Sequence, residues 1–221
     1  MKRDLVSGIL LIAGYVAMLV VMSFHPTGHN LVSPERFAGL ARINVTVHAL
    51  AVATIPVLFL GLLGLTRRLG SSDLTVAALV AWGFGGVAVT IAAVANGFVA
   101  TGVVGRMLAV GDASRDVYHV LLTYTSLVNR SFANVHVVAM SVAILLWSAA
   151  TLRSLRMGRA VGIAGVVAGA GILLGFFSGH LRMTVHGFGI VVLAHAAWLI
   201  WLGILLCRPG PPPASAAGGA P

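Results

Sequence analysis

The chain has 221 residues, of which 59% are apolar and 9% are charged. Soluble domains carry about 25% charged residues, so this composition excludes a soluble globular protein and indicates an integral membrane protein. The net charge of +9 does not indicate nucleic-acid binding, because the arginines stand at the ends of apolar runs, where they anchor to lipid headgroups. The single cysteine, Cys207, excludes an intramolecular disulfide and a CxxC motif.

Six apolar runs are long enough to cross a bilayer, which needs about 20 predominantly apolar residues. They cover roughly 5–24, 44–65, 74–101, 132–152, 160–179 and 185–206. Backbone groups in lipid must find partners within their own segment, and these runs are too continuous for the alternating pattern of a membrane barrel. We therefore predict an all-α polytopic membrane protein with one six-helix domain over residues 1–207.

Lysine and arginine are denser in the connections on one side of the predicted membrane. That side carries Lys2, Arg3, Arg67, Arg68, Arg153, Arg156, Arg159 and Arg208. Cytoplasmic connections are enriched in these residues. The pattern predicts cytoplasmic termini in a bacterial inner membrane, with the connections after the first, third and fifth runs facing outward.

The longest connection, 102–131, has apolar residues at helical spacing. Val117, Leu121, Tyr124 and Val128 share one face of a helix. We predict an amphipathic helix over roughly 115–128 that lies on the outer surface of the membrane. The tail, 208–221, is rich in Pro, Gly, Ala and Ser, and we expect it to be disordered.

Three of the apolar runs begin with a similar tripeptide. The three copies are Thr46-Val47-His48, Asn134-Val135-His136 and Thr184-Val185-His186. Each follows an arginine by a few residues, and these arginines are Arg42, Arg130 and Arg182. The recurrence predicts three helical hairpins, each of which brings one histidine into the membrane from the outer side.

These histidines are the main candidates for a functional site. His48 and His136 are predicted about one turn inside the outer boundary, and His186 at its edge. Ionisable groups within spans are costly and usually mark function. His25, His29, His119 and His180 are predicted at the outer surface, where an interfacial role is the simpler interpretation. His195 faces away from His186 and indicates a second site or a packing contact.

The leading hypothesis is a b-type haem protein, because haem iron takes imidazole ligands and flat apolar walls. His48, His136 and His186 are the candidate axial ligands, and Arg42, Arg130 and Arg182 are candidate partners for the haem propionates. Such a protein would carry out electron transfer or small-molecule redox chemistry near the outer face. It implies a quinone or another redox partner and leaves open a homo-oligomer.

Two alternatives stay open at this stage. Three histidines at one depth could bind copper or zinc, although a zinc hydrolase would also need a carboxylate base, and the acids lie in loops. A cofactor-free transporter or a structural membrane subunit is the other alternative. Asn44, Asn96 and Asn134 add further polar groups to the runs, and Pro56 predicts a kink.

Overall fold

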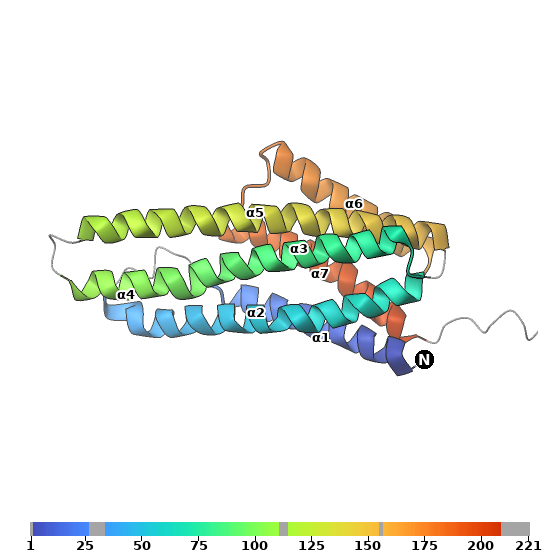
Figure 1. Ribbon diagram of the computed structural model, residues 1–221, viewed down its shortest axis with the longest axis horizontal. Coiled ribbons are helices and arrows are strands. Elements are labelled where there is room, and N and C mark those ends of the chain that lie inside the picture. The colour runs from blue at the N-terminus through green and yellow to red at the C-terminus, as the bar shows by residue number, and fades with distance from the viewer. Residues whose placement is uncertain (1, 27–33, 111–114, 155–156, 209–221) are drawn as a thin grey trace, which may run out of the picture.

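The computed structural model describes residues 2–26, 34–110, 115–154 and 157–208, and every regular element in these ranges is helical (Figure 1). Six helical segments are long and apolar enough to span a membrane. They are Lys2–Ser23 (α1), Pro34–Leu69 (α2), Asp73–Ala109, Arg115–Ser154 (α5), Arg159–Phe177 (α6) and Val185–Cys207 (α7). The predicted all-α fold with six spans is confirmed. The predicted disordered tail lies outside the described residues from 209 onward.

The third span is not one uniform α-helix. It consists of Asp73–Val94 (α3), a π-helical turn at Ala95–Ala100 (η2) and Thr101–Ala109 (α4). A π-helical turn inserts an extra residue into an α-helix and displaces the carbonyl groups around it. This turn contains Asn96, a polar residue within the span.

The ends of the helices follow local sequence signals. Pro34 begins α2, where its missing N–H removes no hydrogen bond. Gly70 follows the last residue of α2 with a φ of 90°, which glycine adopts without strain. Thr184 caps α7, and its side chain accepts a hydrogen bond from the Gly187 N–H.

The spans fall into a long set and a short set. The long segments have 36, 37 and 40 residues, whereas α1, α6 and α7 have 22, 19 and 23. At a rise of about 1.5 Å per residue, α5 is about 60 Å long, roughly twice the hydrocarbon thickness of a bilayer. The long helices lie side by side and continue beyond the point where α1 and α7 stop (Figure 1). At the end of the bundle away from the N-terminus, the long helices therefore extend past α1 and α7 and form a step.

The predicted surface helix at 115–128 is instead the first part of α5, in line with the span that follows. Asn129, Arg130 and Ser131 interrupt the apolar pattern, but they include no Pro or Gly, so the backbone hydrogen bonds continue through them. The separate amphipathic helix was therefore a wrong prediction. Its apolar face remains exposed, with Val117 and Tyr124 at 64% and 66%.

The core is made mainly by α1, α2, α3, α5 and α7. Trp82 and Trp147 are among its largest fully buried side chains. Each indole N–H donates to a hydroxyl on another helix, Trp82 to Tyr15 and Trp147 to Thr66. In the first two predicted hairpins the helices pack along each other, α1 on α2 and α3 on α5. The third hairpin is open, because α6 packs chiefly on α5 and α7 on α1.

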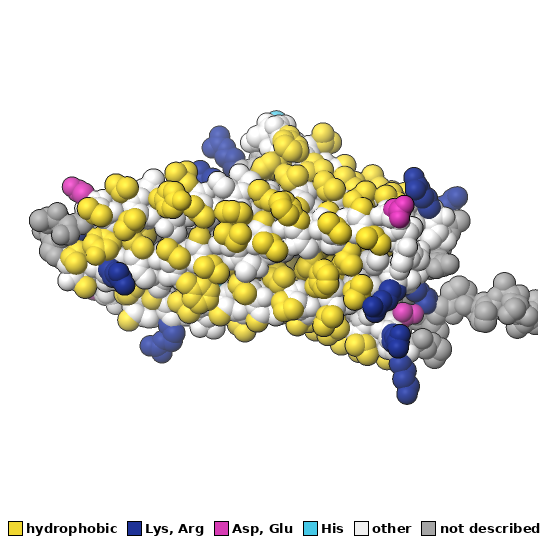
Figure 2. Space-filling model, in the orientation of Figure 1, with side chains coloured by type: hydrophobic (Ala, Val, Ile, Leu, Met, Phe, Trp, Pro, Cys, Tyr) yellow, Lys and Arg dark blue, Asp and Glu magenta, His cyan; other side chains and the backbone are white. Residues whose placement is uncertain are grey.

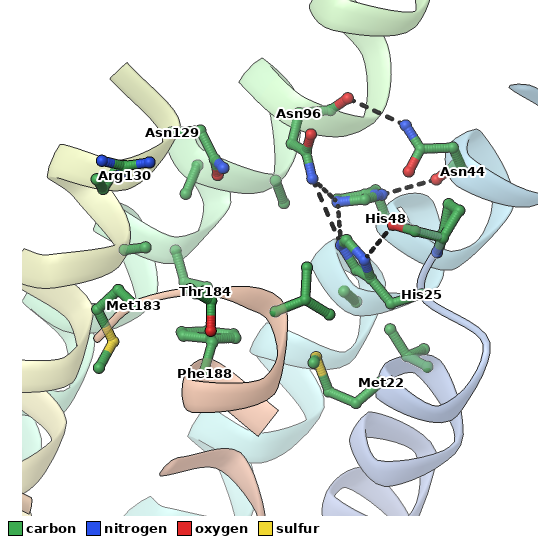
Figure 3. Close-up of a pocket in the computed structure, with 18 of the residues that line it drawn as sticks. Met22, His25, Asn44, His48, Asn96, Asn129, Arg130, Met183, Thr184 and Phe188 are labelled. Atoms are coloured by element: carbon green, nitrogen blue, oxygen red, sulfur yellow. Dashed lines mark hydrogen bonds between the residues drawn. The ribbon is translucent and has the colours of Figure 1, made fainter. Parts of the chain in front are cut away.

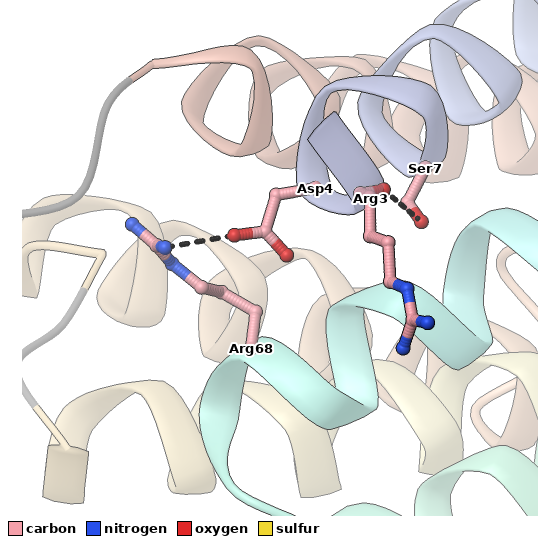
Figure 4. Close-up of polar contacts among 4 residues, drawn as sticks. All are labelled: Arg3, Asp4, Ser7 and Arg68. Carbon is pink, nitrogen blue, oxygen red and sulfur yellow. Dashed lines mark hydrogen bonds and ion pairs between the residues drawn. The ribbon is translucent and has the colours of Figure 1, made fainter. Parts of the chain in front are cut away.

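One end of the bundle carries most of the basic side chains, and hydrophobic side chains cover much of the lateral surface (Figure 2). At this end Arg68 of α2 forms an ion pair with Asp4 of α1 at 2.9 Å (Figure 4). The two side chains are 21% and 26% exposed, and a solvent-accessible ion pair of this kind contributes only about 1 kcal/mol. The packing of α1 on its neighbours therefore depends on shape, through glycines at the crossing points.

The crossing of α1 and α7 yields the first prediction. A Cβ atom on Gly8 would collide with the backbone oxygen of Gly203, whereas nothing lies within 4 Å of one on Gly171 in α6. We expect Gly8→Ala to destabilise the protein by about 1–3 kcal/mol, the usual cost of overpacking. Gly171→Ala should be neutral or stabilising, because alanine favours a helix. Thermal unfolding in detergent measures both, and equal midpoints would contradict this crossing.

Candidate functional site

A cavity of about 740 Å³ lies at the step between the short and the long helices. The end of α1 and the start of α7 form one part of its wall, and the middle of α2, α3 with η2, and α5 form the rest. Its polar lining residues include His25, Asn44, His48, Asn96, Ser126, Asn129, Arg130, Thr184 and His186. Its apolar lining residues include Met18, Val21, Met22, Ala51, Val89, Ala92, Ala93, Met183 and Phe188.

Two histidines meet on one wall of this cavity (Figure 3). His25 follows the end of α1, and His48 lies in α2, where it is 6% exposed. Their Nε2 atoms are 3.2 Å apart, and the ring centroids are 4.8 Å apart with the rings edge to face. The fold thus brings together two imidazole groups that are 23 residues apart in the chain.

The other nitrogen of each ring identifies its tautomer. His48 Nδ1 lies 2.7 Å from the Asn44 carbonyl oxygen, and His25 Nδ1 lies 2.9 Å from the Pro26 carbonyl oxygen. A carbonyl oxygen only accepts, so each Nδ1 must carry a hydrogen and donate it. In the neutral rings both Nε2 atoms therefore present lone pairs, and these lone pairs face each other.

The charge state of His25 agrees with this assignment. Burial lowers the pKa of His25 below its ordinary value, and this effect outweighs the hydrogen bond to the Pro26 carbonyl, which acts in the opposite direction. The ring is therefore neutral at pH 7, with its Nε2 lone pair available for a ligand.

The Asn96 side chain in η2 completes a triangle with the two histidines. Its Nδ2 atom lies 3.2 Å from His48 Nε2 and 3.4 Å from His25 Nε2. One polar atom of the amide therefore contacts both rings. The three side chains come from the end of α1, from α2 and from η2.

The π-helical turn positions this asparagine. The side chain of Asn44 donates to the Asn96 carbonyl oxygen at 3.1 Å and to the Thr101 hydroxyl at 2.9 Å. The Thr101 hydroxyl in turn donates to the Gly97 carbonyl oxygen at 2.8 Å. Asn44 is 1% exposed, so in lipid these carbonyl groups would otherwise lack partners. The same Asn44 thus orients His48 through its backbone and η2 through its side chain.

Close packing at Gly97 fixes the distance between α2 and η2. A Cβ atom at this position would collide with the Cβ and Cγ atoms of His48. Only glycine lets the imidazole lie directly against the backbone of the π-helical turn.

The structure brings together some of the predicted site residues and separates others. His48, His186 and Arg130 line the same cavity, and of these His186 and Arg130 are exposed; Arg42 and Arg182 are also exposed and do not line it. His136 is buried elsewhere, with its Nδ1 donating to the Gly85 carbonyl oxygen at 2.9 Å and its ring 6.0 Å from that of Phe188. Within the described part of the chain, no three His, Cys, Asp or Glu side chains form a cluster.

The remaining histidines lie away from this wall. His195 is 2% exposed, with its Nε2 3.4 Å from the Ser141 hydroxyl. His119 and His180 are exposed, and His29 lies outside the described residues. His25 was not predicted as a site residue, because it immediately follows a span and resembles an interfacial histidine. The polar residues Asn44 and Asn96 within spans were the available signal.

The chain was compared with known protein families, with curated proteins and with solved structures, and no match was found.

The Asn44 network yields the second prediction. Asn44→Ala removes both donated hydrogen bonds and leaves the Asn96 carbonyl oxygen buried without this partner. An unsatisfied buried group costs about 1–3 kcal/mol, so the unfolding midpoint in detergent should fall. Asn129→Ala is the matched control, because Asn129 lines the same cavity but is half-buried and outside this network. Equal stability of the two variants would show that the network does not hold η2.

Proposed function

We propose that the protein is a membrane metalloprotein that binds copper or zinc through His25, His48 and Asn96. The ligand atoms are the two Nε2 atoms and the amide oxygen of Asn96. The observation that carries this proposal is the triangle of polar atoms with edges of 3.2, 3.2 and 3.4 Å.

The dimensions of this triangle match one face of a tetrahedral metal site. Metal–ligand bonds of about 2.0–2.1 Å at tetrahedral angles place neighbouring ligand atoms about 3.3–3.4 Å apart. Half a turn of the Asn96 amide places Oδ1 where Nδ2 lies, because the two groups are nearly identical in size. The ion then has two imidazole nitrogens and one oxygen as ligands.

The surroundings of the histidines also support metal binding. Ligating histidines usually donate their second N–H to a carbonyl or carboxylate, which fixes the ring and its tautomer. His25 and His48 each make such a bond to a backbone carbonyl. The two Nε2 lone pairs face each other and the Asn96 amide, an arrangement that a metal ion would bind once the amide turns its oxygen toward the ion.

The fourth position of the ion faces the cavity and leaves room for water or a small molecule. Three protein ligands with one open position are typical of catalytic rather than structural zinc sites. No Asp or Glu lines the cavity among the described residues. This absence favours copper, because a zinc hydrolase needs a nearby base.

A b-type haem is the second candidate, and the size and lining of the cavity favour it. The cavity is mainly apolar, and His48, His186 and Arg130 all line it. Axial ligands stand on opposite faces of a porphyrin. His25 and His48 are in contact with each other, so they do not form such a pair. In this alternative His48 and His186 are the axial ligands to test, with Arg130 near a propionate.

We propose that the site lies near the outer face of a bacterial inner membrane. The basic side chains that gather around the N-terminal end of the bundle favour a cytoplasmic location for that end (Figure 2). The cavity lies toward the opposite end, where α1 ends and α7 begins.

Metal content tests the proposal directly. Protein purified in mild detergent, loaded with Cu²⁺ or Zn²⁺ and desalted, should retain one equivalent by elemental analysis. His25→Ala and His48→Ala should lose it, because each removes a ligand from the ion. Asn96→Leu should weaken retention, and Asn96→Asp should preserve it, because a carboxylate also supplies a ligand oxygen.

His136→Ala and His119→Ala are the controls and should retain the ion. Equal retention in His25→Ala, His48→Ala and the controls would sink the metal site. A Soret band in the purified protein that disappears in His48→Ala and His186→Ala would favour haem instead.

Cysteine labelling tests the orientation. In a Cys207→Ala background, Asp116→Cys at the start of α5 should react with an impermeant maleimide on intact cells. Ser71→Cys, which is exposed at the opposite end of the bundle, should react only after the membrane is permeabilised. The reverse pattern would put the cavity on the cytoplasmic side.

A further inference from the structure

The cavity has a positive charge that the proposed metal ligands do not explain. Arg130 lines it from α5, and no Asp or Glu lines it within the described part of the chain. In Figure 3 Arg130 lies on a different wall from His25 and His48. A guanidinium group facing an acid-free cavity attracts an anion, and it binds carboxylate or phosphate oxygens with good geometry.

Most of the cavity wall is nevertheless apolar. Met18, Met22 and Met183 contribute flexible side chains that adapt to the shape of a bound chain. The wall also includes Ala51, Val89, Ala92 and Ala93, whose small side chains leave space between α2 and α3. A small inorganic anion would leave this apolar surface uncovered.

A narrow apolar crevice of about 10 Å³, with room for about one water molecule, adjoins the cavity toward the middle of the bundle. It is lined by Met18, Ala51, Val52, Ile55, Val89, Thr90 and Ala93, four of which also line the cavity. From His48 to Ile55 along α2, and from Asn96 to Val89 along α3, the helical rise amounts to about 10 Å. The crevice therefore leads from the polar wall of the cavity toward the hydrocarbon core.

We infer that the cavity binds an anionic amphiphile with a single alkyl chain. Its carboxylate or phosphate lies between Arg130 and the proposed metal ligands, and its chain lies along the apolar wall of the cavity and reaches the crevice at Met18. The contact with the metal ion rests on the proposed function, whereas the contacts with Arg130 and the crevice do not. The site lies at the depth where an amphiphile in a bilayer keeps its headgroup, because α1 and α7 end there.

Binding of defined amphiphiles to the purified, metal-loaded protein tests this inference. Hexadecanoate and lysophosphatidate, measured by displacement of a fluorescent fatty acid, should compete about tenfold or more better than lysophosphatidylcholine, whose headgroup has no net charge. The two anionic probes distinguish a carboxylate from a phosphate ligand. Octanoate should bind more weakly than hexadecanoate, because it buries less apolar surface.

Two substitutions separate the headgroup from the chain. Arg130→Gln should weaken hexadecanoate binding about tenfold or more, the value of a hydrogen bond to a charged group. Ala51→Leu should narrow the cavity where it adjoins the crevice and weaken hexadecanoate more than octanoate. Ala49→Leu is the matched control, because Ala49 lies on the exposed face of the same helix. Thermal unfolding of each variant verifies that it is folded.

The outcomes separate this inference from the metal site. Unchanged hexadecanoate binding in folded Arg130→Gln, or equal competition by lysophosphatidylcholine, would overturn the amphiphile. Metal content is measured on the same samples. If the protein retains no metal after loading but still binds hexadecanoate through Arg130, the metal site is overturned and the amphiphile is supported. If the protein retains the metal but binds no anionic amphiphile, the amphiphile is overturned and the metal site is supported.

Discussion

The π-helical turn at Ala95–Ala100, held by the side chain of Asn44, is the constraint on which the site depends. A turn of this kind displaces carbonyl groups from regular α-helical pairing, and in lipid there is little water to satisfy them. Asn44 supplies the missing donor to the Asn96 carbonyl oxygen, and the Thr101 hydroxyl does the same for that of Gly97. The turn therefore exists only with α2 against it at this register. That register brings His48 within hydrogen-bond distance of the Asn96 side chain.

The unequal lengths of the helices explain where the cavity lies. Three long segments form a continuous bundle, and α1 and α7 cover only part of it. Where these two helices stop, the long helices lack neighbours and the chain enters connections. His25 lies at one of these ends and His186 at the other. Polar groups at such a step contact the protein interior on one side and the membrane–water interface on the other. The buried His136 and His195 lie within the bundle and do not line the cavity.

The charged side chains that line the cavity are positive, with no acidic residue among the described ones. Imidazole rings, amides and one guanidinium group line it, without a carboxylate among the described residues. A cation held by lone pairs and an anion held by Arg130 are complementary ligands for such a surface, because each stabilises the other. A low dielectric strengthens that attraction. The proposed metal site and the proposed amphiphile are therefore physically compatible in one cavity.

The sequence by itself determined the fold class, because continuous apolar runs of sufficient length have no alternative to helices in lipid. It also indicated that imidazole and amide groups carry the polar chemistry of the spans, since Asp and Glu are absent from the apolar runs. It misplaced the helix over 115–128, because an amphipathic pattern does not distinguish a surface helix from an extension of a span.

The composition of the site was decided by tertiary structure. Hydropathy assigns depth to a histidine but not the direction of its side chain, so His136 and His48 looked equivalent. Only the packing of α2 on η2, through Gly97, points His48 toward the cavity while His136 turns to the Gly85 carbonyl. His25 joins His48 because the end of α1 lies beside α2, a contact that depends on the helix–helix interface and not on local sequence.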